Sequence, residues 1–195
     1  MKAYYDARAP EYDDVWHSRG RYANRDRRGW LEQVTLLSEL LGSLPPARTL
    51  DVACGTGFLT RHLRGEVTAL DQSARMVAVA RERLPEAHVV QGDAVPLPFA
   101  DGAFERLFTG HFYGHLLEGE REAFLAEARR VAPELLVVDS ARRAEVPDER
   151  WEERELDDGT RHRVYKRWFT GAGLAAELGG GEVLHDGRWF VAVRG

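Results

Sequence analysis

The feature that most constrains the fold is an alternation of short apolar runs with helical segments over the first 140 residues. The apolar runs end at polar residues or glycine and mark the expected strands: 48–53, 66–70, 87–90, 104–109 and 135–138. The expected helices precede or separate these strands: 31–41, 58–63, 74–84 and 120–131. Apolar strands that alternate with helices are typical of parallel β-α-β units. The sequence therefore predicts an α/β fold with a Rossmann-like, doubly wound sheet that is mostly parallel.

The pattern changes in the C-terminal quarter of the chain. Asp157-Asp158-Gly159-Thr160 and Asp186-Gly187 have the residue types of tight turns, and strand-like segments flank each of them. A short helix, 174–178, is expected between the two hairpins, with Thr170 as its N-terminal cap. The sheet is therefore expected to end in antiparallel strands, including the C-terminal one.

Size and composition set the domain organisation. A chain of 195 residues corresponds to about one domain at roughly 150 residues each. We expect a single domain over residues 1–195, with residues 1–30 as a helical lid segment and residues 145–170 as a hairpin insertion. A hydrophobic content of 44% excludes disorder over most of the length.

Net charge, cysteine content and the lengths of the apolar runs limit which partners, location and metals the chain is expected to have. The 27 basic and 32 acidic residues give a net charge of −5, which disfavours nucleic acid as a partner. Cys54 is the only cysteine, so a disulfide framework is excluded and a reducing, cytoplasmic location is expected. No apolar run approaches the roughly 18 residues of a membrane helix, so no membrane association is expected. No metal-ligand spacing is present, and we expect no metal.

The segment Leu50–Gly57 (LDVACGTG) turns from the first strand into a glycine loop. Gly55 and Gly57 permit a sharp turn and a close approach of a ligand to the backbone. A dinucleotide-binding loop would have a third glycine where Thr60 stands. Asp51 attracts a cation, which a pyrophosphate site would avoid. The helix expected from residue 58 would point its free N–H groups and the positive end of its dipole at the loop, where a carboxylate can be held. The expected ligand therefore carries both an ammonium and a carboxylate group.

Acidic residues end the next two strands. Asp71 ends the second strand, beside the first in a doubly wound sheet, where its carboxylate can accept hydrogen bonds from both hydroxyls of a ribose. Asp93 follows the third strand and could accept from an adenine amino group. Met76 packs either against the adenine or in the core, and the sequence leaves both open.

With these residues in this order, the chain resembles the class I S-adenosylmethionine-dependent methyltransferases of the small-molecule, ubiquinone-biosynthesis-like type. The segments that carry the resemblance are LDVACGTG, LDQSARM, QGDA, PLPFADGAFERLF (in which Glu105 replaces the usual Asp), Tyr12-Asp13 and His115-Leu116.

The resemblance implies a residue for each part of S-adenosylmethionine. Asp51 and the backbone of Ala53, Gly55 and Gly57 would hold the methionine part. Asp71 and Gln72 would hold the ribose. Met76, Asp93 and Ala94 would frame the adenine. Tyr12 would close over the cofactor, and Thr109 would lie near the sulfonium.

The implied activity is methyl transfer to an O, N or S nucleophile of a small molecule. His111 follows the fourth strand and is the expected general base where the acceptor must lose a proton; a packing role is the alternative. Aromatic residues near the N-terminus would form the lid over the sulfonium, and the hairpin would cover the acceptor. The run of arginines between residues 19 and 28 either recruits an anionic substrate or forms a solvated face.

Two other functions remain open on the sequence alone. The first is a cofactor-binding module without catalysis. The second is a nicotinamide-dependent oxidoreductase, against which Asp51 and the missing third glycine count. The sequence assigns neither the methyl acceptor nor the oligomeric state.

Overall fold

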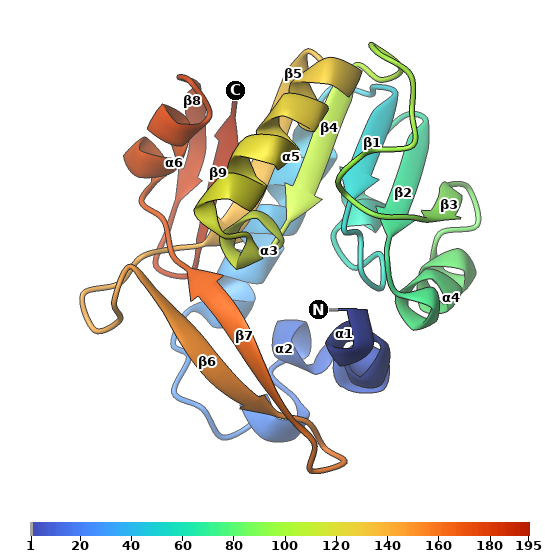
Figure 1. Ribbon diagram of the computed structural model, residues 1–195. Coiled ribbons are helices and arrows are strands. Elements are labelled where there is room, and N and C mark those ends of the chain that lie inside the picture. Colours follow the sequence, from blue (N-terminus) through green and yellow to red (C-terminus); the bar gives the residue numbers. More distant parts are fainter. Residues whose placement is uncertain (1) are drawn as a thin grey trace.

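The computed structural model describes residues 2–195 and contains a seven-stranded sheet in the order β3-β2-β1-β4-β5-β9-β8 (Figure 1). Its strands are β1 (Thr49–Val52), β2 (Val67–Asp71), β3 (His88–Gln91), β4 (Arg106–Gly110), β5 (Glu134–Ser140), β8 (Glu182–Asp186) and β9 (Phe190–Arg194). Strands β1 to β5 are parallel, and β9 runs antiparallel to both β5 and β8. The predicted doubly wound sheet with an antiparallel C-terminal strand is confirmed.

Helices cover both faces of this sheet. The helices within residues 2–195 are α1 (Lys2–Arg8), α2 (Asp14–His17), α3 (Trp30–Ser43), α4 (Ala74–Arg83), α5 (Glu118–Val131) and α6 (Gly171–Glu177), of which α1 and α2 lie at one end of the sheet. In Figure 1, α5 lies in front of the sheet and α3 behind it. Among residues 2–195, every helix is too short or too polar to serve as a membrane span.

Side chains of the central strands alternate between two apolar cores. Leu107 of β4 packs with Phe124 of α5, whereas its neighbour Phe108 packs with Leu37 of α3. Burial on both faces explains why the central strands are almost continuously apolar rather than alternating in polarity.

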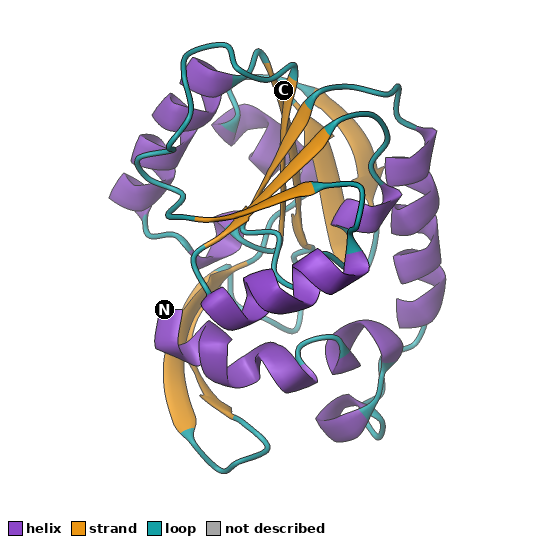
Figure 2. Ribbon diagram, turned by 90° about the vertical axis from the view of Figure 1, so that its right-hand side faces the viewer, coloured by secondary structure: helices purple, strands orange, loops and turns teal. Residues whose placement is uncertain are grey.

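A second, two-stranded sheet lies beyond the carboxyl ends of the parallel strands. It is a hairpin of β6 (Glu149–Glu155) and β7 (Arg161–Arg167), with its turn at the predicted Asp157–Thr160. Both ribbon views place this hairpin and the N-terminal helices at the same end of the main sheet (Figures 1 and 2). Tyr4 of α1 packs in one cluster with Leu156 and Val164, so the hairpin and the N-terminal segment support each other.

One predicted helix is wrong. In place of a helix over 58–63, the fully described segment between β1 and β2 has only a 3-10 turn, Thr60–His62. Gly57 and Gly65 have φ of 77° and 99°, outside the helical range, and Leu63 is already extended. A Cβ on Gly65 would lie 2.4 Å from the backbone oxygen of Ala47, which shows how tightly the chain turns back into β2. A helix dipole at the glycine loop is therefore not part of the site.

Gly57 of the glycine loop has a packing role. Its φ of 77° lies in the left-handed region, and a Cβ at this position would lie 2.7 Å from Cδ1 of Leu84. Leu84 is buried next to α4, so it has little room to move. Glycine is required here both by the backbone conformation and by the neighbouring side chain.

We predict that Gly57→Ala lowers the free energy of unfolding by about 2–4 kcal/mol, the sum of left-handed strain and overpacking. Gly102→Ala is the matched control, because Gly102 has a φ of 62° and a Cβ there would meet no atom within 4 Å. This control should cost only about 1–2 kcal/mol. Urea denaturation of the two variants checks the difference. Equal losses would show that the Leu84 contact is relaxed without cost.

Candidate functional site

A cavity of about 450 Å³ lies at the carboxyl ends of β1, β2 and β4. Its wall contains most of the residues that the sequence predicted to hold the cofactor. They are Tyr12, Ala53, Gly55, Asp71, Gln72, Asp93 and Ala94, joined by the predicted catalytic His111. The structure thus brings together residues that are as far as 99 positions apart in the chain.

Asp71 fixes the shape of this cavity. Its Oδ2 accepts a hydrogen bond from the backbone N–H of Gly55 at 2.9 Å, and its Oδ1 accepts one from Ser73 at 2.8 Å. The end of β2 therefore holds the glycine loop that follows β1. Burial raises the pKa of Asp71, and the two backbone N–H groups oppose the shift. Each carboxylate oxygen keeps a lone pair for a further donor.

Asp51 lies within β1 and outside the cavity wall. It is 1% exposed, and its Oδ2 accepts a hydrogen bond from the Thr60 hydroxyl at 2.6 Å. Its Oδ1 is buried and has no hydrogen-bond partner within residues 2–195. Burial and, to a smaller extent, the negative charge of Asp71 together raise the pKa of Asp51 to about 8, against the opposing effect of the Thr60 hydrogen bond. An orphaned buried acceptor beside the glycine loop fits a ligand with an ammonium group.

Three other predicted residues also lie behind the wall. Gly57 packs against Leu84, and Met76 is completely buried in α4. The hydroxyl of Thr109 donates to the backbone oxygen of Val52 at 2.8 Å and so ties β4 to β1. These residues support the wall from behind, and for Met76 the structure shows core packing.

The N-terminal half of α5 and the loop before it also contribute to the wall, which we did not predict from the sequence. Leu116, Gly119, Glu120 and Ala123 line the cavity. The helix begins at Glu118, two residues before the predicted start, and the Glu120 carboxylate accepts a hydrogen bond from the backbone N–H of Leu117 at 2.7 Å. A glutamate three residues after the N-cap is typical of the first turn of a helix, so Glu120 could have been used to predict where α5 begins.

A larger cavity of about 1030 Å³ lies between the N-terminal helices and the β6–β7 hairpin. Four side chains line both cavities: Tyr5, Tyr12, His111 and His115. The two cavities therefore meet at the end of β4, where His111 is the first residue after the strand.

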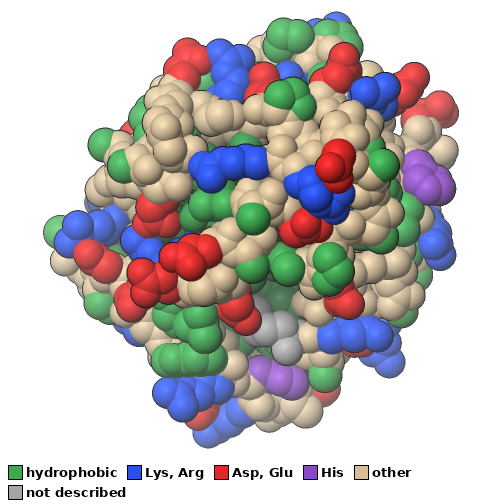
Figure 3. Space-filling model, turned by 45° about the horizontal axis from the view of Figure 1, so that its top comes forward, with side chains coloured by type: hydrophobic (Ala, Val, Ile, Leu, Met, Phe, Trp, Pro, Cys, Tyr) green, Lys and Arg blue, Asp and Glu red, His purple; other side chains and the backbone are tan. Residues whose placement is uncertain are grey.

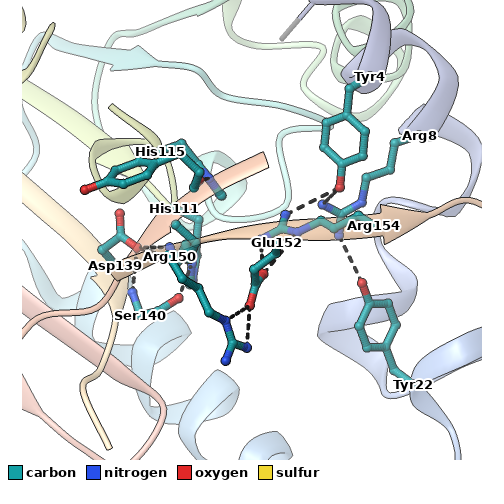
Figure 4. Close-up of polar contacts among 12 residues, drawn as sticks. Tyr4, Arg8, Tyr22, His111, His115, Asp139, Ser140, Arg150, Glu152 and Arg154 are labelled. Carbon is teal, nitrogen blue, oxygen red and sulfur yellow. Dashed lines mark hydrogen bonds and ion pairs between the residues drawn. The ribbon is translucent and has the colours of Figure 1, made fainter. Parts of the chain in front are cut away.

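His111 is held in an unusual conformation at this junction. Its φ is 57°, and its ring contacts those of Trp16 and Phe190 at centroid distances of 5.1 and 5.4 Å. Its Nδ1 lies 3.3 Å from the Ser140 hydroxyl and 3.9 Å from Asp139 Oδ1 (Figure 4). Its Nε2 is buried without a partner within the described chain. Burial lowers the pKa of His111 to about 4, so the ring is neutral at pH 7.

A buried ion pair connects this junction to the hairpin. Lys166 of β7 donates to Asp139 Oδ1, and Asp139 Oδ2 accepts a hydrogen bond from the backbone N–H of Gly114 at 2.7 Å. Burial disfavours the Asp139 carboxylate, but the positive charge of Lys166 keeps its pKa below the usual range. His115 Nδ1 lies 2.6 Å from the backbone oxygen of Tyr165. The hairpin thus positions both histidines of the junction.

Comparison with known proteins gives matches in sequence. A family model described as a methyltransferase domain matches residues 50–134. The demethylmenaquinone methyltransferase of Thermotoga maritima is 35% identical over 107 residues, 52% of this chain and 44% of that protein. The malonyl-[acyl-carrier protein] O-methyltransferase of Enterobacter lignolyticus is 41% identical over 76 residues, 36% of this chain and 30% of that protein. The chain spans about half the length or less of these curated relatives.

The structural match covers nearly the whole chain. A solved structure described as the DhpI-SAM-HEP complex has a TM-score of 0.77 and 26% sequence identity, and the match covers 98% of this chain and 94% of that one. The sheet order, the glycine loop with its acidic strand ends and these matches agree: the chain contains a methyltransferase domain over residues 50–134, and over nearly its whole length it is similar to a protein solved in complex with SAM.

Proposed function

We propose that the chain binds S-adenosylmethionine in the 450 Å³ cavity and transfers its methyl group to a small molecule bound in the 1030 Å³ cavity. The observation that carries this proposal is that the two cavities meet at the end of β4 and share four side chains. A donor and an acceptor bound on either side of this junction are held close together, and such proximity lowers the barrier of a two-substrate reaction. Two of the relatives are named as methyltransferases of demethylmenaquinone and of a malonyl-[acyl-carrier protein].

Each part of the cofactor has a proposed partner. Asp71 and Gln72 bind the ribose, and Asp93 and Ala94 frame the adenine. The backbone of Ala53 and Gly55 binds the methionine carboxylate. Asp51 lies just behind the wall, and its Oδ1, which has no partner within the described residues, is the proposed acceptor for the ammonium group. Tyr12 closes the cavity from the N-terminal segment, with its ring 3.3 Å from where a Gly55 Cβ would stand.

When bound, S-adenosylmethionine supplies a methyl carbon on a positively charged sulfur, and the bonding electron pair returns to sulfur as the acceptor's lone pair forms the new bond. His111 stands at the junction, but a pKa near 4 makes it a weak base. We propose that its free Nε2 positions the acceptor by a hydrogen bond. The role of general base remains a prediction that its pKa does not favour.

In this proposal the N-terminal segment 1–30 covers both cavities through Tyr5 and Tyr12, and the hairpin segment 145–170 covers the larger cavity. The two segments contact each other at Tyr4, Leu156 and Val164, and in this proposal the contact limits the access of water to the bound ligands. Water exclusion strengthens the electrostatic interactions of the enclosed groups.

Thermal unfolding tests the proposed cofactor. S-adenosylhomocysteine should raise the melting temperature of the chain, because a ligand that binds only the folded state stabilises it by mass action. NAD is the control and should have no effect. Stabilisation by NAD alone would favour an oxidoreductase. Transfer of a labelled methyl group to a metabolite extract then separates an enzyme from a binding module, which would yield no labelled product.

We predict that Asp51 releases a proton when the cofactor binds. With a pKa near 8, Asp51 is mostly protonated at pH 7, and a bound ammonium group favours its carboxylate form. Calorimetric titration with S-adenosylhomocysteine at pH 7, in buffers of different ionisation enthalpy, should show up to one proton released. Asp51→Asn should abolish the release while binding is retained at lower affinity. An unchanged release in this variant would contradict the role of Asp51.

A further inference from the structure

The larger cavity is strongly basic, although the whole chain has a net charge of −5. Its basic wall residues are Arg8, Arg21, Arg25, Arg27, Arg143, Arg150, Arg154 and Lys166. Its acidic wall residues are Asp26, Glu152, Glu153 and Glu155. On the outer face of Figure 3, by contrast, basic and acidic side chains are interspersed. Three of the basic wall residues are paired with acids outside the wall: Arg21 with Glu11 and Asp157, Arg143 with Glu145, and Lys166 with Asp139. The excess positive charge of the cavity therefore lies on the other arginines.

Most of the acidic wall residues are paired with arginines outside the wall. Glu153 and Glu155 both pair with Arg161, at 3.2 and 2.8 Å. Asp26 pairs with Arg28 at 3.4 Å. These carboxylates therefore do little to neutralise the arginines of the cavity.

Arg8 is buried without an acidic partner. Its side chain donates to the hydroxyls of Tyr4 and Tyr22, at 2.9 and 3.2 Å (Figure 4). Its guanidinium stacks over the ring of Tyr12 at 4.9 Å. Within residues 2–195 it forms no salt bridge, and it is only 8% exposed. The guanidinium of Arg8 has five N–H donors, and the two tyrosine oxygens do not satisfy all of them. A buried charge of this kind is costly unless an opposite charge is bound beside it.

Two neighbouring arginines share a single carboxylate. Glu152 accepts from Arg150 at 2.8 Å and from Arg154 at 3.1 Å, so it neutralises only one of them (Figure 4). Arg154 also donates to the Tyr4 hydroxyl, at 3.4 Å, which links this pair to Arg8.

Arg27 provides a further unneutralised charge. It stacks on the ring of Trp30 at 3.0 Å and donates to the backbone oxygen of Val15, and it forms no salt bridge in the described part of the chain. Burial and the nearby charges of Arg25 and Arg143 lower the pKa of Arg27 to about 10. Of these three arginines, Arg143 is paired with Glu145 at 3.3 Å, whereas Arg27 and Arg25 form no salt bridge within residues 2–195. An anion bound in the cavity would neutralise Arg27 and Arg25.

We propose that the larger cavity binds a small organic oxyanion and that a negatively charged oxygen of this molecule accepts the methyl group. The proposal rests on the proposed function of the smaller cavity. An oxygen lone pair of the anion forms the bond to carbon as the carbon–sulfur bond breaks and its electron pair stays on sulfur. The product is a methyl ester with one negative charge fewer than the acceptor, and no proton is transferred.

The chemistry of the junction agrees with such an acceptor. Burial lowers the pKa values of His111 and His115, so neither is an effective base. A carboxylate or a phosphorus oxyanion is already ionised at pH 7 and needs none. Arginine binds both anions through paired N–H groups.

Calorimetric titration of the chain, with and without S-adenosylhomocysteine, tests this proposal. The probes are methylphosphonate and acetate, with acetamide as the uncharged control. At least one anion should bind, acetamide should not, and the affinity should fall as salt is added. Tighter binding of methylphosphonate would indicate a phosphorus acid as the natural acceptor, and tighter binding of acetate a carboxylic acid.

Three variants assign the binding to the cavity. Arg8→Gln and Arg27→Gln should each lower the affinity for the more tightly bound anion at least tenfold. Arg64→Gln removes the same charge from an exposed arginine outside both cavities and should change the affinity less than twofold. Circular dichroism verifies folding, and Arg27→Gln carries the test if Arg8→Gln does not fold.

The outcomes separate this proposal from the proposed function. If S-adenosylhomocysteine binds but neither anion does, or if acetamide binds as well as acetate, the anionic acceptor is refuted alone. Equal affinities in Arg27→Gln and Arg64→Gln would also refute it. If an anion binds in the cavity but S-adenosylhomocysteine does not bind at all, the proposed methyl donor fails while the anion site stands.

Discussion

The buried ion pair between Lys166 and Asp139 is the interaction on which the junction of the two cavities depends. It joins the β6–β7 hairpin to the end of β5, immediately beside His111. Removing one partner of such a pair typically costs about 3–5 kcal/mol, because the other charge stays buried without compensation. Asp139 also accepts from the backbone of Gly114, so the same carboxylate shapes the loop that follows β4. The hairpin is in this way a fixed wall of the larger cavity.

Two carboxylates on neighbouring strands have different surroundings, which suits them to different parts of one ligand. Asp71 is held by two backbone N–H groups and faces the smaller cavity. Asp51 has one oxygen bonded to Thr60 and the other without a partner among the described residues. The two hydrogen bonds to Asp71 hold its carboxylate in a fixed orientation as an acceptor. Asp51 Oδ1, by contrast, gains a hydrogen bond only when a ligand with a donor group binds. The resemblance to a known family and the local geometry thus point to the same ligand.

Much of the fold could be predicted because its signals are local. Asp157–Thr160 and Asp186-Gly187 specify their turns, and Ser73 caps α4 by accepting from the backbone of Met76, as expected from its position. The helix expected at 58–63 failed because the constraint is distant: the chain must turn back against Ala47 at Gly65. The cofactor cavity was largely predictable, since strand ends of a parallel sheet meet at one edge.

The larger cavity could not be predicted in the same way. Whether an arginine is neutralised depends on carboxylates far away in the chain, and sequence patterns do not show those pairings. Glu11 and Asp157, for instance, both lie against Arg21, while no acid in residues 2–195 pairs with Arg8. The run of arginines in the N-terminal segment therefore left both an anion site and a solvated surface open.

A crystal structure of the chain with S-adenosylhomocysteine tests the central claim most directly. We predict that the ribose hydroxyls lie against Asp71 and that the sulfur points past His111 toward the larger, arginine-lined cavity. A ligand whose sulfur faces away from that cavity, or one bound outside the cavity at the ends of β1 and β2, would contradict it.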